Sequence, residues 1–434
     1  MKIEHIEVKN FRGFASRTFD FSPSFNVLIG DNGTGKTAIL DALAIAAGAI
    51  FLGLDGPSPP GIHRDDVRQV MHTRSEVPTL ESIYPTEVVC RGTVEGYTCD
   101  WARTLEGRHK HTTHGRASEV SQIANFWNDE VRAGKDIVLP LVSYYGTGRL
   151  WLQRRARRSV VSDGARVLKP GSRLRGYHGC LDPSSDHKGF VSWFKTMEMI
   201  QLQQGQPLGT LSAVKRALRQ CMRGWTDVRY DLRLGTLVAQ KKGVQLPFEM
   251  LSDGARSMLA MVGDIAYRAA TLNPHLRDRA PAQTPGIVLI DELDLHLHPR
   301  WQREVVDDLR KAFPEMQFVA TTHSPFIIQS LRENELINLD DQNREALPSR
   351  SIEDITEEVM GVKVPQRSHR HQEMMEAARK YYAALQKAKK TKGPELKRLK
   401  EQLDALSAPF SDDVAYHAFL EMQRGKARLP GDDS

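Results

Sequence analysis

An eight-residue glycine-rich loop, residues 30–37, constrains the fold of this chain more than any other segment. It reads G-D-N-G-T-G-K-T and matches the pattern G-x-x-x-x-G-K-[ST]. The apolar run before it, residues 25–29, predicts a buried strand. The Ala-, Ile- and Leu-rich stretch after it, residues 37–51, predicts a helix. A strand, a glycine loop and a helix in this order direct backbone N–H groups and a helix N-terminus at a phosphate.

The side chains of this loop predict where a nucleotide and a metal ion bind. Lys36 is expected to reach the β- and γ-phosphates, and the Thr37 hydroxyl is expected to ligate Mg²⁺. We therefore expect ATP and Mg²⁺ as cofactors. The residues expected to contact the nucleotide from this segment are Gly30, Asn32, Gly33, Thr34, Gly35, Lys36, Thr37 and Ala38.

The second half of the predicted site lies far along the chain, at residues 286–292. This apolar run ends in two carboxylates, Asp291 and Glu292. Phosphoanhydride hydrolysis needs a second Mg²⁺ ligand, for which Asp291 is suited, and a group that activates or orients water, for which Glu292 is suited. The alternative is a polar strand end that caps the next helix. Beside an intact phosphate loop, we favour the catalytic interpretation.

A third candidate element, residues 251–255, reads L-S-D-G-A and precedes an expected helix over residues 256–272. Ser252 suits an N-cap, and Gly254 permits close backbone approach. The loop resembles the signature loop of ABC-type ATPases, usually L-S-G-G-Q. The resemblance implies that Ser252 and Gly254 bind a γ-phosphate held by the opposite subunit, and hence a homodimer or higher homo-oligomer formed through the heads. An ordinary capped helix is the alternative.

Two further residues are assigned by resemblance. An apolar strand leads into His323, which resembles the switch histidine that hydrogen-bonds the γ-phosphate in the same ATPases. Residues 6–14 resemble the opening strand and turn of RecF- and SMC-like ATPase heads. In those heads, the arginine at the position of Arg12 lies near the nucleotide phosphates.

One run is more specific still. Residues 291–302 resemble the corresponding segment of the OLD-like and Septu-type (PtuA) defence ATPases, including those that accompany some retrons. Residues 144–151 resemble the same subgroup. They occupy the place of the Q-loop, but the usual glutamine is missing.

These elements predict an α/β fold, namely a P-loop ABC-type ATPase head with an inserted helical lobe and a C-terminal helical hairpin. The expected head covers residues 1–345. Its nucleotide-binding core is expected at 1–55 and 285–345, and its lobe at about 100–272. Residues 346–434 are expected to form a helical, partner-binding region.

Composition narrows the setting in which the protein works. No run approaches the roughly 18 apolar residues of a membrane span, so we expect no membrane contact. The N-terminus begins on a strand that carries Glu4 and Glu7, unlike a signal peptide. The four cysteines are scattered, as is typical of reduced thiols. We therefore expect a cytoplasmic protein.

Residues 149–175 form a basic segment with nine Lys or Arg residues and a single acid, Asp163. Such a segment binds nucleic acid through its phosphates, contacts an acidic protein surface, or is simply solvated. A DNA or a retron RNA/DNA partner is therefore one expectation. The leucine spacing within residues 396–406 fits one helical face, which either binds a partner or packs on the protein's own head.

The sequence lacks the nuclease residues that its resemblance leads one to look for. OLD-family proteins carry a C-terminal Toprim nuclease with an E-G motif and a later D-x-D, and neither follows Asn338. No H-N-H constellation is present either. The resemblance to the Septu pattern therefore implies a separate nuclease subunit of HNH type.

Two functions remain open. The first is an ATPase, converting ATP and water into ADP and phosphate with slow turnover, that serves a bacterial antiphage defence complex and regulates a separate effector nuclease. The second is a RecF-like DNA-repair or maintenance ATPase.

Overall fold

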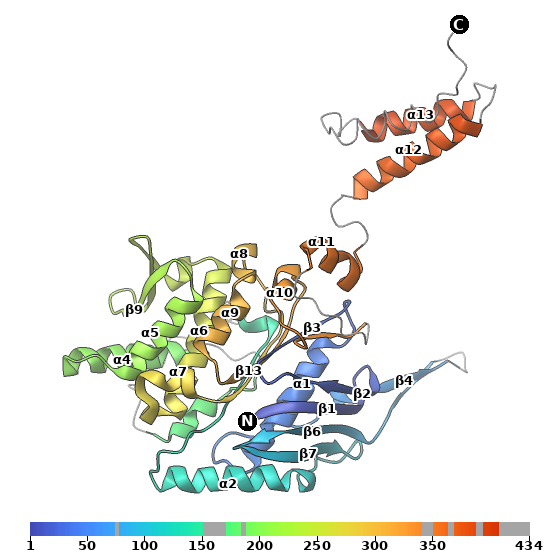
Figure 1. The fold of residues 1–434 in the computed structure, drawn as a ribbon. Helices are drawn as coiled ribbons and strands as arrows, with labels where there is room; N and C mark the ends of the chain where they lie inside the picture. The colour runs from blue at the N-terminus through green and yellow to red at the C-terminus, as the bar shows by residue number, and fades with distance from the viewer. Residues whose placement is uncertain are drawn as a thin grey trace. The chain divides into compact units, whose positions relative to one another are not determined.

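The computed structural model describes residues 1–73, 78–150, 171–183, 188–340, 350–362, 369–387 and 394–407. The chain divides into two compact units, Met1–Ile355 and Thr356–Ser434 (Figure 1). Within the described residues, no helix is long and apolar enough to cross a membrane. Most of the basic segment expected at 149–175, namely residues 151–170, lies outside the described part of the chain.

A five-stranded parallel sheet carries the phosphate loop. Its strand order is β14-β3-β13-β12-β8, and every pair is parallel. The strands are β3 (Phe25–Ile29), β8 (Leu141–Tyr145), β12 (Gly286–Ile290), β13 (Met316–Thr321) and β14 (Leu336–Asn338). Every residue of β3, β12 and β13 is buried, which explains why these strands are mostly apolar, because a parallel sheet is covered on both faces. The expected α/β fold is confirmed.

The second sheet of the head is antiparallel, in the order β2-β1-β6-β7. Its strands are β1 (Lys2–Phe11), β2 (Phe14–Asp20), β6 (Thr86–Val94) and β7 (Tyr97–Leu105). Helix α1 (Lys36–Ala47) contacts strands of both sheets, so nine of its residues are buried. The Trp101 indole donates a 2.9 Å hydrogen bond to the carbonyl of Ala46 and ties the antiparallel sheet to this helix.

Helices and a small sheet extend the head beyond these two layers (Figure 1). They are α2 (Ser118–Arg132), α4 (Lys188–Gln204), α5 (Gly209–Cys221), α6 (Asp253–Leu272), β9 (Trp225–Asp231), β10 (Thr236–Lys241) and β11 (Val244–Pro247). One expectation about this region needs correction. Strand β8 falls inside the range 100–272 expected for the lobe, yet it belongs to the parallel sheet, because its apolar residues pair with β12.

The remaining elements of the head are short. They are β4 (Gln69–His72), β5 (Thr79–Ser82), α7 (Ala280–Gln283), α8 (Pro299–Gln302), α9 (Val305–Ala312), α10 (Pro325–Gln329) and α11 (Ile352–Asp354). The expected helix after the phosphate loop ends at Ala47 and continues as the 3₁₀ helix η1 (Gly48–Leu52).

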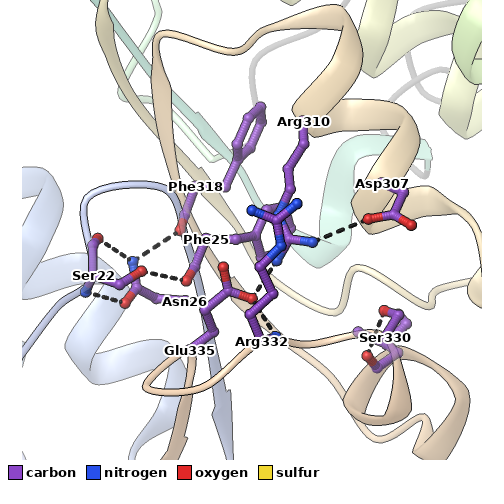
Figure 2. A network of polar contacts seen from close by, with 10 residues as sticks. Ser22, Phe25, Asn26, Asp307, Arg310, Phe318, Ser330, Arg332 and Glu335 are labelled. Atoms are coloured by element: carbon purple, nitrogen blue, oxygen red, sulfur yellow. Dashed lines mark hydrogen bonds and ion pairs between the residues drawn. The ribbon is translucent and has the colours of Figure 1, made fainter. Parts of the chain in front are cut away.

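A buried ion pair lies at the end of the parallel sheet where β3 begins (Figure 2). Arg310 of α9 pairs with Glu335, just before β14, and their side chains are only 9% and 5% exposed. The guanidinium also donates to Asp307 at 3.1 Å and lies 5.5 Å from the ring centre of Phe25. Glu335 accepts a 2.7 Å bond from the backbone N–H of Arg332. These contacts hold β14 beside the strand that enters the phosphate loop.

The second unit contains two helices that pack on each other, α12 (His369–Lys387) and α13 (Pro394–Ser407). Its apolar cluster consists of Met374, Ala377, Ala378, Tyr382 and Leu403. Leu406 packs against this cluster. Part of the leucine face expected over residues 396–406 is therefore used to join the two helices.

Candidate functional site

A pocket of about 440 Å³ gathers most of the predicted site residues beside the ends of β3, β12 and β13. Its lining comes from four separate parts of the sequence: the turn after β1, the phosphate loop, the turn after β12 and the end of β13. The lining residues are Arg12, Gly13, Phe14, Asn32, Gly33, Thr34, Gly35, Lys36, Thr37, Ala38, Asp291, Glu292, Thr321 and His323. The fold thus brings these residues, which lie far apart in the sequence, into one pocket.

Glycines allow the phosphate loop to adopt backbone angles that other residues avoid. Gly33 has a φ of +89°, and Gly35, which directly precedes α1, has a φ of +97°. A Cβ at Gly35 would lie 2.5 Å from the Phe14 ring. The Phe14 ring therefore lies directly against the loop and leaves room only for a glycine at position 35.

The Lys36 ammonium is held over the loop. It donates hydrogen bonds to the carbonyls of Gly30 at 2.7 Å and Asp31 at 3.0 Å. Burial lowers the pKa of Lys36, and nearby carboxylates, Asp340 foremost, oppose that change. The ammonium is thus held close to the backbone of the phosphate loop.

Hard oxygen donors meet on the other side of the pocket. The Thr37 hydroxyl donates to Asp291 Oδ2 at 2.9 Å, and Thr321 donates to Asp291 Oδ1 at 2.6 Å. Asp291 is only 6% exposed. A hydroxyl and a carboxylate are the ligands that Mg²⁺ prefers, since it commonly takes one or two protein ligands together with substrate phosphates. The donor set that is present therefore fits this ion.

The backbone of Glu292 adopts a left-handed conformation, with a φ of +49°. Such a φ is uncommon for a residue with a side chain and marks strained positions. The N–H of Glu292 donates to the Thr321 hydroxyl at 2.7 Å, and the N–H of Leu293 donates to the Thr321 carbonyl at 2.9 Å. Glu292 lines the pocket from this turn.

His323 also lines the pocket, and the carboxylate of Asp294 holds its backbone in place. Its N–H donates to Asp294 Oδ1 at 3.2 Å, and the same oxygen accepts from the Thr322 hydroxyl at 2.5 Å. The carboxylate of Asp294 thus fixes the turn that presents the imidazole. Sequence reasoning had not assigned a role to Asp294.

Arg12 lies at the pocket wall between two carboxylates. Its guanidinium pairs with Asp41 at 2.7 Å and with Asp66 at 2.9 Å. Burial lowers the pKa of Arg12, but the two aspartates outweigh that effect and raise it overall. Burial also raises the pKa of Asp41, which Arg12 and a hydrogen bond with Tyr144 oppose. Tyr144 begins the segment 144–151, which the sequence resemblance compares with a Q-loop.

The two residues of the candidate signature loop are not part of this pocket lining. Ser252 caps α6, since its hydroxyl accepts the N–H of Ala255 at 3.4 Å. Gly254 packs against the backbone of His296, where a Cβ would lie 2.4 Å from the carbonyl oxygen. Within one chain, therefore, the site forms without Ser252 and Gly254.

Sequence reasoning missed several residues that shape the site. Asp41 follows Thr37 by four residues on the same helix face, so helical spacing is a signal that marks it. Phe14 and Thr321 line the pocket, and Asp340 accepts the N–H of Asp31 in the phosphate loop; all three lie at turns or strand ends and reach these positions through tertiary pairing. No local pattern distinguishes them.

Comparisons with known proteins agree with this geometry. Residues 5–204 match a family described as AAA domain, and residues 181–328 match one described as AAA ATPase domain. The Retron Ec83 probable ATPase of Escherichia coli is 24% identical and covers 76% of this chain and 70% of that protein. The Retron Vc95 probable ATPase of Vibrio cholerae serotype O1 biovar El Tor is 22% identical, with coverages of 77% and 73%.

A Septu relative shares less of its own length with this chain. The Septu protein PtuA of Bacillus mycoides (strain KBAB4) is 26% identical to this chain. The match covers 79% of this chain but only 41% of that protein. These matches confirm the expected resemblance: the chain is similar to two retron probable ATPases and to the Septu protein PtuA, and parts of it match AAA ATPase family models.

Proposed function

We propose that this chain is the ATP-binding and ATP-hydrolysing subunit of a bacterial antiphage defence complex, in which it regulates a separate effector nuclease. The observation that carries this proposal is the pocket that joins the phosphate loop, Asp291, Glu292 and His323. The relatives supply the biological setting, since they are retron and Septu ATPases.

In this proposal the loop binds the nucleotide phosphates through its N–H groups and Lys36. Thr37 and Asp291 would hold Mg²⁺, which offsets phosphate charge when it is bound. Glu292 accepts a proton from the attacking water, or orients that water, and His323 donates a hydrogen bond to the γ-phosphate. The position of Lys36 and the bonds at Asp291 support these assignments.

We further propose that two copies pair head to tail, so that Ser252 and Gly254 of one copy complete the pocket of the other. The support for this pairing is that both residues lie at an N-terminus outside their own pocket. A helix N-terminus suits an anionic phosphate because its N–H groups are unpaired within the helix.

The regulated partner is proposed to be a nuclease of HNH type. The sequence carries no recognisable nuclease residues of its own. In this proposal, the head covers residues 1–345, and the region at 346–434 and the basic segment at 149–175 contact the nuclease or nucleic acid.

Phage protection and affinity capture test the proposal together. The tagged full-length chain is expected to capture an HNH nuclease encoded beside it, and the pair is expected to protect cells from phage. Changing Arg154, Arg155, Arg157 and Arg158 to Ala together should weaken capture while ATP hydrolysis survives. If the contact is to nucleic acid, the slope of the logarithm of the binding constant against the logarithm of the salt concentration should become shallower by up to about four.

Two outcomes count against the proposal. Wild-type capture and protection by a chain ending at about residue 350 would remove the proposed role of the C-terminal region. Tight binding of duplex DNA with no nuclease partner would instead favour the RecF-like maintenance function.

A further inference from the structure

One buried hydroxyl joins the two carboxylate residues of the candidate site. Thr321 is the last residue of β13 and is only 1% exposed. Its hydroxyl lies 2.6 Å from Asp291 Oδ1 and 2.7 Å from the backbone nitrogen of Glu292. A hydroxyl has a single hydrogen, and a backbone N–H can only donate. Thr321 must therefore accept from Glu292 and donate to Asp291.

The first of these bonds fixes the orientation of the Asp291 carboxylate. With Oδ1 engaged by Thr321, Oδ2 is directed at the Thr37 hydroxyl, 2.9 Å away. The terminal torsion of an aspartate is broad, so packing alone would leave the carboxylate free to rotate. The Thr321 hydroxyl removes that freedom at the proposed metal ligand.

The second bond fixes the turn that carries Glu292. The φ of +49° at Glu292 costs energy and persists only where its surroundings hold it. Thr321 supplies two of those restraints, because its hydroxyl accepts the N–H of Glu292 and its carbonyl accepts the N–H of Leu293. One residue therefore sets the place of both carboxylate-bearing residues.

We propose that Thr321 is a positioning residue, which fixes the orientation of the Asp291 carboxylate and the backbone of Glu292 as hydrolysis requires. The proposal rests on the proposed ATPase function and adds to it a residue that acts through Asp291 and Glu292. The alternative is a buried threonine that only stabilises the fold. Thr284 provides that comparison, since it is fully buried and accepts a 3.0 Å bond from Asn273 outside the pocket.

The test compares Thr321→Val, Thr321→Ser and the control Thr284→Val in the full chain. Val keeps the shape of threonine and removes the hydroxyl, whereas Ser keeps the hydroxyl. ATP affinity is measured in EDTA with a fluorescent ATP analogue, and kcat, KM and the Mg²⁺ concentration for half-maximal activity are measured with ATP. Thermal unfolding reports folding for each variant.

Thr321→Val is expected to bind nucleotide in EDTA within about twofold of wild type. It should lower kcat by about 10- to 100-fold and raise the Mg²⁺ requirement, as loss of a ligand-orienting partner typically does. Ser should restore kcat to within about threefold, and Thr284→Val should shift unfolding without changing kcat.

Wild-type kcat and Mg²⁺ requirement in Thr321→Val would overturn the proposal, as would a Ser variant as slow as Val. If Val prevents folding, the Ser variant decides alone, because a slowed but folded Ser enzyme contradicts the proposal and a normal one supports it. Failure of the ATPase assignment looks different, because wild-type protein itself would then neither bind nor hydrolyse ATP.

Discussion

The backbone N–H of Asp31 donates a 2.7 Å hydrogen bond to the carboxylate of Asp340, 309 residues away. Asp340 follows β14, so the edge strand of the parallel sheet holds the first turn of the phosphate loop. The same carboxylate is the foremost group that opposes the burial-induced fall in the pKa of Lys36. One acidic side chain thus stabilises both the shape of the loop and its positive charge.

Asp340→Asn is expected to shift the alkaline limit of ATP binding to lower pH. The amide still accepts the Asp31 N–H but no longer supports the ammonium charge, so the pKa of Lys36 falls further below its ordinary value of 10.5. Binding requires charged Lys36 and is lost as pH rises through that pKa. Nucleotide titrations between about pH 7 and about pH 10 measure the limit. Asp100→Asn, at an exposed pair with Arg91, is the control, and identical limits in both variants would contradict the prediction.

Loss of the buried pair at the sheet edge should destabilise the head. Arg310→Met leaves Glu335 buried without its partner, and we expect a loss of about 3–5 kcal/mol in the free energy of unfolding. The exposed pair of Arg91 and Asp100 offers a matched control, for which Arg91→Met should leave the free energy of unfolding nearly unchanged. Denaturant unfolding compares the two variants. Equal losses in the free energy of unfolding would show that the buried Arg310 pair stabilises the head no more than the exposed pair does.

Glu292→Gln should slow ATP hydrolysis by about 100- to 10,000-fold while nucleotide binding remains. The amide cannot take a proton from water, whereas Asp291 and Thr37 are unchanged. ATP-bound dimers should then accumulate, because a ligand that binds one assembly state selectively stabilises it. Light scattering with and without ATP detects them. Hydrolysis at the wild-type rate would place the catalytic base elsewhere.

Much of the site follows from local pattern, and the remainder depends on tertiary pairing. The residues of the loop at 30–37, Asp291 and His323 each end or follow an apolar strand, so their spacing predicts their convergence. Asp340 and Thr321 act through partners on other strands, and no single-sequence pattern gives that pairing. Strand β8 lies within the range 100–272 expected for the lobe but pairs with β12, and an apolar run alone does not show which sheet a strand joins.

Paired heads predict that two inactive variants complement each other. Lys36→Ala removes the loop cation and Ser252→Arg blocks the signature loop, so each homodimer should be inactive. In a mixed dimer, the intact loop of one copy faces the intact signature loop of the other. An equal mixture should recover about a quarter of wild-type hydrolysis, since about half of the dimers are mixed and each has one working site. No recovery, in chains shown to dimerise, would contradict shared sites.

Equilibrium binding of labelled ATP to the wild-type chain and to Lys36→Ala tests the central claim most directly. Lys36 is the loop cation, held by the carbonyls of Gly30 and Asp31, and its side chain lies at the pocket rather than in the core. The variant is therefore expected to remain folded by circular dichroism and to lose ATP binding, whereas the wild-type chain binds. Wild-type affinity in a folded Lys36→Ala chain would contradict the assignment of this loop as the nucleotide site.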